Sequence, residues 1–358
     1  MELSPASSLS DLRISINDAL SQFVARENQY LRTIGPELNP VADALERFLL
    51  DSGKRIRPLF AYIGLLGTGT EGNLPLLKAA SALELVHVCA LMHDDVMDAS
   101  DTRRGAPSIH RAFEAMHEAE GLQGSATQFG ISSAILLGDL ALIWASKMLH
   151  ESGIDNEVLV RSIPVYDEMR VELMAGQYLD VYEQALASQS VERSLRVARY
   201  KSGKYSIERP LHFGAALGSA MSTKLMAQYS KYGLPLGEAF QLRDDVLGVF
   251  GDPKETGKPA GDDLREGKRT VLMATTFERT SESQKAKIAE LFGDPNLSPE
   301  GVSQLQEIIV GTGSLAHLET LIDSLTSQAL TAIEDQEISA IAQTHLKSMV
   351  DIAIRRTV

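Results

Sequence analysis

The stretch from residue 81 to residue 97 constrains the fold of this chain more than any other. Its side chains are apolar on nearly every side, which is typical of a helix buried inside a protein. Polar residues nevertheless recur along it, and at about 100° per residue they fall in one stripe. The members of this stripe are Glu84, His87, Asp94, Asp95 and Asp98. The stripe therefore faces something polar.

The acidic end of this stripe predicts a metal-bound phosphate. Asp94 and Asp98 are one helical turn apart, so their carboxylates lie side by side, and Asp95 borders them. Such a cluster costs free energy in a buried helix unless cations neutralise it. Hard oxygen ligands favour Mg²⁺, which commonly bridges one or two carboxylates to substrate phosphates. For this motif alone, a solvated acidic helix end is the alternative, and the spacing does not fit a calcium-binding EF-hand loop.

Composition and periodicity predict an all-α protein. The 358 residues are 44% hydrophobic and only 6% aromatic, and no alternation of period two persists. The chain has no composition break that would mark a domain boundary, so we expect a single domain over residues 1–358. The formal net charge of −14 argues against binding to nucleic acid, because both partners would repel each other.

The sequence also predicts a cytoplasmic protein without a membrane span. Cys89 is the one cysteine, so an intrachain disulfide is impossible. The N-terminus lacks the pattern of a signal peptide. The most apolar segment, Ile131 to Ala145, is interrupted by Asp139 and is too short to cross a bilayer.

Basic residues occur at two places where they could hold an anion. Lys54, Arg55 and Arg57 form the densest positive cluster and lie near an expected helix start, where backbone N–H groups also favour anions. Arg103 and Arg104 follow the carboxylates of the central helix, and arginine makes bidentate contacts with phosphate. The alternatives are a solvated basic turn and simple pairing of the arginines with nearby aspartates.

A second acidic site follows the same plan further along the chain. Asp244 and Asp245, preceded by Gln241, end an expected apolar helix that starts near Gly233. A polar, glycine-rich loop comes next and carries Lys258 and Lys268. Between the two acidic sites, Lys201 and Ser202 precede a glycine that would weaken or kink a helix. Two aspartate pairs facing each other would form a two-sided Mg²⁺ clamp around one diphosphate.

Taken in order, these motifs resemble the trans-isoprenyl diphosphate synthases, the head-to-tail prenyltransferases. The resemblance covers roughly residues 50–270 and rests on these segments: Gly53 to Pro58, His87, Asp94 to Asp98, Arg103-Arg104, Gly176 to Asp180, Lys201-Ser202, Phe240 to Asp245, Gly257-Lys258 and Lys268. It implies a single large bundle of long helices around a deep central cavity, of the isoprenoid synthase type, in a homodimer. The implied reaction adds isopentenyl diphosphate to an allylic diphosphate such as dimethylallyl, geranyl or farnesyl diphosphate.

The resemblance also implies a role for each matching residue. The ligands of about three Mg²⁺ ions would be Asp94, Asp98 and Asp244. The allylic diphosphate would be held by Arg103, Lys201, Lys258 and Lys268, and isopentenyl diphosphate by Lys54, Arg57, His87 and Arg104. The carbocation formed when the allylic C–O bond breaks would be stabilised by the Lys201 carbonyl, the Ser202 hydroxyl and Gln241. The residues expected to act in catalysis are thus Asp94, Asp98, Arg103, Lys201, Ser202, Gln241, Asp244 and Lys258.

The chain departs from the family pattern most clearly at Gly248, where the family usually has a third aspartate. This removes one possible carboxylate from the metal site, although Asp245 and Asp262 remain nearby in the sequence. Ser202, where the family more often has threonine, is a milder departure.

The residues before the first aspartate predict the product length. In the family, a Phe or Tyr four or five residues before this aspartate closes the tail cavity early, whereas Cys89 and Ala90 are small here. We therefore expect geranylgeranyl diphosphate as main product, with Val86, Leu83 or the partner subunit as the cavity floor.

Several readings of the chain remain open from the sequence. A farnesyl or a longer polyprenyl product is possible in place of geranylgeranyl diphosphate. A non-catalytic regulatory subunit of a heteromeric prenyltransferase is a third reading, to which Gly248 gives slight support. A class I terpene cyclase would leave the cluster at Lys54 and Arg57 without a purpose.

Overall fold

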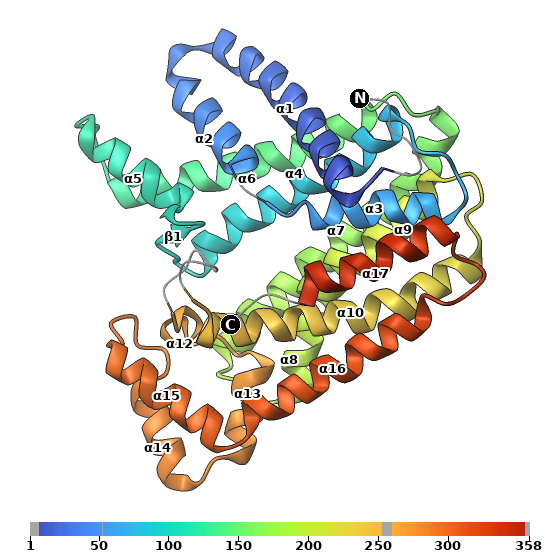
Figure 1. Cartoon of the computed structure of the whole chain (residues 1–358). Helices are drawn as coiled ribbons and strands as arrows, with labels where there is room; N and C mark the ends of the chain where they lie inside the picture. Colours follow the sequence, from blue (N-terminus) through green and yellow to red (C-terminus); the bar gives the residue numbers. More distant parts are fainter. Residues whose placement is uncertain (1–6, 52, 253–259, 355–358) are drawn as a thin grey trace. The chain divides into compact units, whose positions relative to one another are not determined.

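The computed structural model describes residues 7–51, 53–252 and 260–354, and it is almost entirely helical (Figure 1). The expected all-α class is confirmed. Contacts group the chain into two compact units. Unit 1 comprises Met1–Pro164 and Pro210–Met221, and unit 2 comprises Val165–Arg209 and Ser222–Val358. The single domain over residues 1–358 and its central cavity stay predictions, because compactness of parts does not decide whether they fold separately.

Unit 1 is built around the central helix α4. Its elements are α1 (Leu9–Ile34), the 3₁₀-helix η1 (Pro36–Leu38), α2 (Asn39–Leu50), α3 (Ile56–Gly67), α4 (Leu74–Met97), β1 (Thr102–Arg103), β2 (Ala106–Pro107), α5 (Ile109–Ala119), α6 (Ala126–His150), the start of α7 (Asn156–Ala185) and nearly all of α9 (Arg209–Leu217). Helix α4 packs against α6 and α3, and α1 pairs with α2 (Figure 1). The Asn73 side chain caps α4 by accepting a hydrogen bond from the Leu76 N–H at 2.9 Å.

The polar stripe of α4 is neutralised inside unit 1 by arginine. Glu84 and Arg55 are each only 2% exposed, and Arg55 Nη1 donates to Glu84 Oε1 at 2.8 Å. Arg55 also donates to Asn17 Oδ1 at 2.7 Å and to the Leu49 carbonyl at 2.7 Å. The guanidinium therefore joins α1, α2 and α4, which explains how a glutamate is accommodated in an apolar helix.

Unit 2 is built around α10 (Thr223–Phe250). Its other elements are the remainder of α7, α8 (Val191–Val197), the π-helix η2 (Ala198–Glu208), α12 (Asp262–Glu266), α13 (Val271–Arg279), α14 (Glu282–Leu291), α15 (Pro299–Gly311), α16 (Ser314–Ala332) and α17 (Ala340–Ile354). Helix α10 packs against η2, α16, α17, α12 and α13. The buried Tyr232 hydroxyl donates to the Leu346 carbonyl at 3.0 Å and so ties α10 to α17.

The predicted bounds of α10 were wrong at both ends. The helix begins at Thr223, where the Ser222 side chain accepts from the Leu225 N–H at 3.0 Å, instead of near Gly233. Gly233 lies within the helix, and a Cβ there would lie 2.7 Å from Glu208 Cα, so the close approach of η2 requires glycine at this position. The helix also continues past Asp244 and Asp245 to Phe250.

Within the part of the chain that the structure describes, two helices, α4 and α6, are long and apolar enough to cross a membrane by length and composition. Helix α6 has 25 residues and extends beyond the apolar segment from Ile131 to Ala145 at both ends. In α4, 67% of the most apolar window is buried, as in the core helix of a folded protein.

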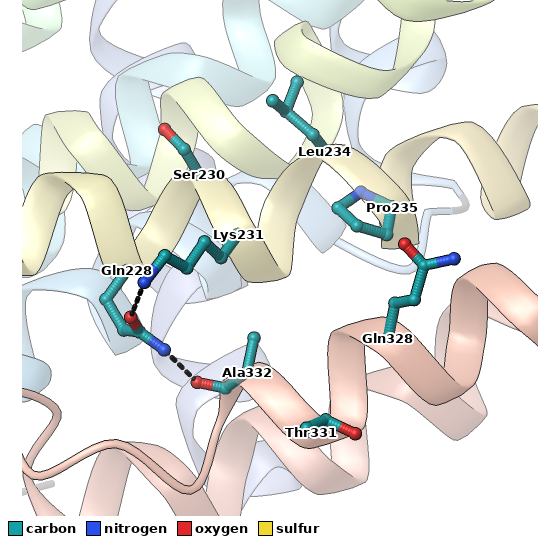
Figure 2. Close-up of a pocket in the computed structure, with 8 residues that line it drawn as sticks. All are labelled: Gln228, Ser230, Lys231, Leu234, Pro235, Gln328, Thr331 and Ala332. Atoms are coloured by element: carbon teal, nitrogen blue, oxygen red, sulfur yellow. Dashed lines mark hydrogen bonds between the residues drawn. The ribbon is translucent and has the colours of Figure 1, made fainter.

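A pocket of about 620 Å³ lies between α10 and α16 in unit 2 (Figure 2). Its lining residues are Gln228, Ser230, Lys231, Leu234, Pro235, Gln328, Thr331 and Ala332. Gln228 Nε2 donates to the Ala332 carbonyl at 2.6 Å, and Lys231 Nζ donates to Gln228 Oε1 at 3.2 Å. None of the described residues that were predicted to act on a diphosphate lines this pocket.

Replacement of Arg55 by alanine should destabilise the protein by about 3–5 kcal/mol, because Glu84 would be left buried without its cation. Urea unfolding followed by circular dichroism measures the change. Lys285→Ala is the matched control, since it breaks an exposed pair with Glu282 and should leave the unfolding midpoint unchanged. Equal midpoints for Arg55→Ala and the parent protein would contradict the role given to this pair.

Candidate active site

The first aspartate motif uses its middle carboxylate for structure. Asp95 is 1% exposed, and its Oδ1 accepts from Arg103 Nε at 2.8 Å and also from Arg103 Nη2. Asp94 and Asp98 are both half-buried, and Asp94 Oδ2 lies 3.8 Å from Arg103 Nη2. The guanidinium assigned to the allylic diphosphate therefore also borders the predicted metal ligands.

A tight hairpin after α4 returns Arg103 to this helix and places Arg104 against α2. Strands β1 and β2 pair antiparallel, and the two residues between them, Arg104 and Gly105, have φ values of 55° and 77°. Positive φ at both turn positions is the geometry of a two-residue hairpin. Arg104 donates to the Phe48 carbonyl at 3.0 Å, and its guanidinium lies 5.5 Å from the centre of the Phe48 ring.

The residues predicted to hold isopentenyl diphosphate gather in unit 1. Lys54 is exposed and precedes α3, and Arg57 lies in the first turn of this helix. Burial lowers the pKa of His87 well below its ordinary value, and the charges of Arg57, Arg104, Arg103 and Arg55 lower it further. The cluster therefore joins a neutral imidazole to several cations, a combination suited to an anionic group.

Backbone strain is concentrated beside this cluster. Among the described residues, four non-glycine residues have positive φ, and three of them flank the predicted site: Arg55 at 53°, Ala99 at 53° and Arg104 at 55°. Strained backbone that the surrounding structure maintains is common at binding sites.

The second aspartate motif, like the first, contains a buried aspartate beside a half-buried one. Asp245 is 3% exposed, and its two oxygens accept from Gln241 Nε2 at 2.8 Å and from the Val271 N–H at 3.1 Å. Burial raises the pKa of Asp245 to about 8, the Gln241 and Val271 hydrogen bonds oppose this rise, and the charges of Asp263 and Asp244 add to it. Asp245 thus ties α10 to the start of α13, and Asp244 is the half-buried member of the pair.

The carboxylates could hold magnesium only together with substrate phosphates, which would complete the set of metal ligands. Within residues 7–51, 53–252 and 260–354, no group of three or more His, Cys, Asp or Glu side chains could hold a metal ion by itself. Mg²⁺ typically binds one or two carboxylates, several waters and substrate phosphates. Asp94, on the last turn of α4, and Asp98, which caps the end of this helix, meet that requirement.

Lys201 and Ser202 lie in η2, a π-helix of 11 residues. Lys201 Nζ donates to Asp180 Oδ2 at 2.6 Å, which links η2 to α7. Glycines let neighbouring backbones approach η2 closely. A Cβ on Gly176 would lie 2.4 Å from the Lys201 nitrogen, and one on Gly237 would lie 2.5 Å from Gly203 Cα. A rare helix type held by such contacts is frequent at functional sites.

Sequence analysis did not identify the ionic network that supports η2. Lys204 Nζ donates to Glu172 Oε1 at 2.5 Å, and Arg209 Nε donates to Glu172 Oε2 at 2.6 Å. Arg209 also pairs with Glu168 at 2.8 Å. The charges at 168, 172, 204 and 209 show no recognisable spacing, because the network joins α7 to a segment more than thirty residues later.

The predicted site residues are divided between the two units. Unit 1 contains Lys54, Arg57, His87, Asp94, Asp98, Arg103 and Arg104, and unit 2 contains Lys201, Ser202, Gln241, Asp244 and Lys268. Lys268 Nζ lies 3.0 Å from Glu266 Oε2. Lys258 lies outside the described residues.

Replacement of Gly237 by alanine should lower the free energy of unfolding by about 1–3 kcal/mol, because the added methyl would overlap the Gly203 backbone. Gly311→Ala is the matched control in another helix. A Cβ there meets nothing within 4 Å, so this change should raise stability by up to about 1 kcal/mol through helix propensity. Urea unfolding measures the change in stability of both variants. A Gly237→Ala variant more stable than the parent protein would contradict the close approach of Gly237 to Gly203.

Comparison with known proteins identifies the family to which these motifs belong. The family model for polyprenyl synthetase matches residues 39–309. A crystal structure of geranylgeranyl pyrophosphate synthase from Corynebacterium glutamicum, complexed with isoprenyl diphosphate and magnesium, is 41% identical with a TM-score of 0.94, covering 98% of this chain and 100% of that one.

Two curated archaeal relatives are more distant in sequence. A geranylfarnesyl diphosphate synthase from Aeropyrum pernix is 33% identical over 75% of this chain and 79% of the relative. A geranylgeranyl diphosphate synthase from Sulfolobus acidocaldarius is 27% identical over 96% of both chains. The chain therefore belongs to the polyprenyl synthetase family and is a trans-prenyltransferase.

Proposed function

We propose that this enzyme condenses isopentenyl diphosphate with dimethylallyl, geranyl and farnesyl diphosphates and makes geranylgeranyl diphosphate as main product. The observation that carries the proposal is the arrangement in unit 1. Two half-buried carboxylates, Asp94 and Asp98, lie at the C-terminal end of α4, and the charges of four arginines lower the pKa of His87 on the same helix. The name of the Corynebacterium glutamicum neighbour supports the same product.

One of the two substrates is proposed to bind with metal and the other without it. Asp94, Asp98 and Asp244 are proposed to hold about three Mg²⁺ ions, which when bound would neutralise charge on the allylic diphosphate. Arg103, Lys201, Lys258 and Lys268 are proposed to bind that diphosphate directly. Lys54, Arg57, His87 and Arg104 are proposed to bind isopentenyl diphosphate without metal, since arginine and lysine neutralise a phosphate by themselves.

The chain's own residues would then stabilise the charges that develop in the reaction. Cationic side chains stabilise negative charge that grows on the departing diphosphate, which lets the allylic C–O bond ionise. The Lys201 carbonyl, the Ser202 hydroxyl and the Gln241 side chain are proposed to face the developing allylic cation. Apolar walls would exclude water, so the isopentenyl double bond attacks the cation before water can.

The residues before Asp94 support a product of twenty carbons. Cys89, Val86 and Leu83 are fully buried in unit 1, and Cys89 Sγ lies 3.7 Å from His93 Nδ1. None of the three is aromatic, so a tail running along α4 would meet no ring at these positions. The names of two relatives, a geranylgeranyl and a geranylfarnesyl diphosphate synthase, indicate that the products of related enzymes differ in carbon-chain length.

We also propose that the enzyme is a cytoplasmic homodimer. Apolar side chains are exposed on α6 in unit 1, among them Ile135, Leu136 and Ile143, which are 43%, 65% and 63% exposed. In unit 2, α7 exposes Val171 and Tyr178. Exposed apolar groups at helical spacing are typical of a surface that a second protein covers.

Turnover with purified protein tests the proposed reaction. Isopentenyl diphosphate is supplied with each allylic diphosphate in turn, and the dephosphorylated products are separated by chromatography. We expect a dominant twenty-carbon alcohol, and Asp94→Ala should lose most of the turnover with an unchanged circular dichroism spectrum. No product from any starter would instead support a regulatory subunit, and an active Asp94→Ala would contradict the metal assignment.

Replacement of Cys89 by phenylalanine should shift the main product to fewer carbons, because the ring would fill space beside the growing tail. The product profile and the melting temperature are measured together, since the ring also enters a buried position. Cys89→Ala, which adds no bulk, is the control and should keep the profile of the parent enzyme. An unaltered profile in a folded Cys89→Phe would contradict the proposed floor.

A further inference from the structure

Three residues spaced four apart on α7 face the π-helix η2 within unit 2. They are Glu172, Gly176 and Asp180, and this spacing places them on one face of a helix. Asp180 Oδ2 accepts from Lys201 Nζ at 2.6 Å, and a Cβ on Gly176 would lie 2.4 Å from the Lys201 nitrogen. These two contacts hold the part of η2 that carries Lys201. Glu172, one turn earlier on α7, contacts the C-terminal end of η2 instead.

Glu172 binds two cations that lie five residues apart. Its Oε1 accepts from Lys204 Nζ at 2.5 Å and from Arg209 Nη2 at 2.8 Å, and its Oε2 accepts from Arg209 Nε at 2.6 Å. The exposed fractions of these three side chains are only 12–15%. Burial would raise the pKa of Glu172, but the hydrogen bonds from Arg209 and Lys204 outweigh it and keep this pKa below its ordinary value. The carboxylate is therefore charged at neutral pH.

The spacing of these two cations matches the hydrogen bonds of a π-helix. Such bonds join residues five apart, whereas those of an α-helix join residues four apart. The Arg209 N–H donates to the Lys204 carbonyl, which is the backbone bond at the C-terminal end of η2. In an α-helix, side chains five residues apart would point about 140° away from each other around the axis. Glu172 thus binds the side chains of the same two residues that the π-type backbone bond joins.

The pairing expected of an α-helix is the weaker one here. Glu208 lies four residues after Lys204, the spacing at which opposite charges pair on an α-helix. Lys204 Nζ nevertheless lies 3.9 Å from Glu208 Oε2 and only 2.5 Å from Glu172 Oε1. Glu208 Oε1 instead accepts from Ser230 Oγ of α10 at 2.6 Å. The charged contacts of Lys204 therefore favour the π-helical register.

We propose that Glu172 is a positioning residue that holds η2 in its π-helical register and thereby aims the Lys201 carbonyl and the Ser202 hydroxyl. This inference rests on the proposed function, which assigns these two groups to the allylic cation. Such groups contribute only while positive charge develops, so a change in their direction lowers kcat and leaves KM nearly unchanged. Asp180 holds the Lys201 ammonium separately, so the contact proposed for the diphosphate does not depend on Glu172.

Glu172→Gln in the full chain tests the inference, because it keeps the size of the side chain and removes its charge. A crystal structure without substrates should show the Arg209 N–H bonded to the Tyr205 carbonyl, the partner that an α-helix gives it, instead of the Lys204 carbonyl. The single-turnover rate with farnesyl diphosphate and labelled isopentenyl diphosphate should fall about 10- to 100-fold, as for a small misplacement of groups at a reacting centre. The KM of either substrate should change little.

Glu183→Gln is the matched control on the same helix. Glu183 is buried and accepts from Arg193 Nε at 2.7 Å and from Arg193 Nη2 at 2.6 Å, but Arg193 lies on α8 outside η2. This change should lower the melting temperature and leave the single-turnover rate unchanged. Lys204→Met, which removes one of the cations that Glu172 binds and keeps the aliphatic chain, should lower the rate as Glu172→Gln does. Its kinetics test the inference without crystals.

An intact π-helix in crystals of Glu172→Gln would overturn the inference. Equal losses of rate in Glu172→Gln and Glu183→Gln would overturn it as well, because they would indicate a general loss of structure. An altered helix with an unchanged rate would instead remove the assignment of Lys201 and Ser202 to the cation, and the catalytic role of Glu172 with it. A parent protein without turnover would refute the proposed function, whereas the crystal structure would still decide whether Glu172 holds the register of η2.

Discussion

The free-energy cost of charge in an apolar helix governs the organisation of unit 1. Helix α4 is buried along most of its length, yet it carries Glu84 and Asp95 at 2% and 1% exposure. Each carboxylate is held by one arginine, Glu84 by Arg55 and Asp95 by Arg103. Without these pairs, the desolvation of two carboxylates would oppose the burial of α4 itself. The strained backbone at Arg55 and the hairpin after Arg103 position those two guanidiniums.

The two aspartate motifs have the same arrangement of buried and half-buried carboxylates. In each, the second aspartate is buried and tied to a neighbouring segment, Asp95 to the hairpin through Arg103 and Asp245 to the start of α13. The first aspartate of each motif is half-buried. A motif of adjacent aspartates thus buries one carboxylate as an anchor and leaves the other partly accessible, because adjacent residues on a helix point in different directions.

Much of the fold and of the candidate site could be predicted from local sequence. The bounds of α1, Leu9–Ile34, follow from the helical period and the Ser8 cap, which are both local signals. The start of α10 could not be placed, because Gly233 and Pro235 are usual breakers that tertiary packing here tolerates. The ion pairs of Glu172 escaped prediction because their partners are distant in the sequence.

The sequence by itself determined the chemistry: acidic pairs on apolar helices, each followed by basic residues, indicate metal-assisted handling of a diphosphate. These signals are local, since the identity and spacing of side chains on one helix suffice to read them. Only the tertiary structure decided which carboxylates are buried anchors, and only it brought Glu172 against Lys204 and Arg209. The physical reason is that the residues of one helix determine which side chains share a face, whereas the partner that this face meets is brought there by packing between distant segments.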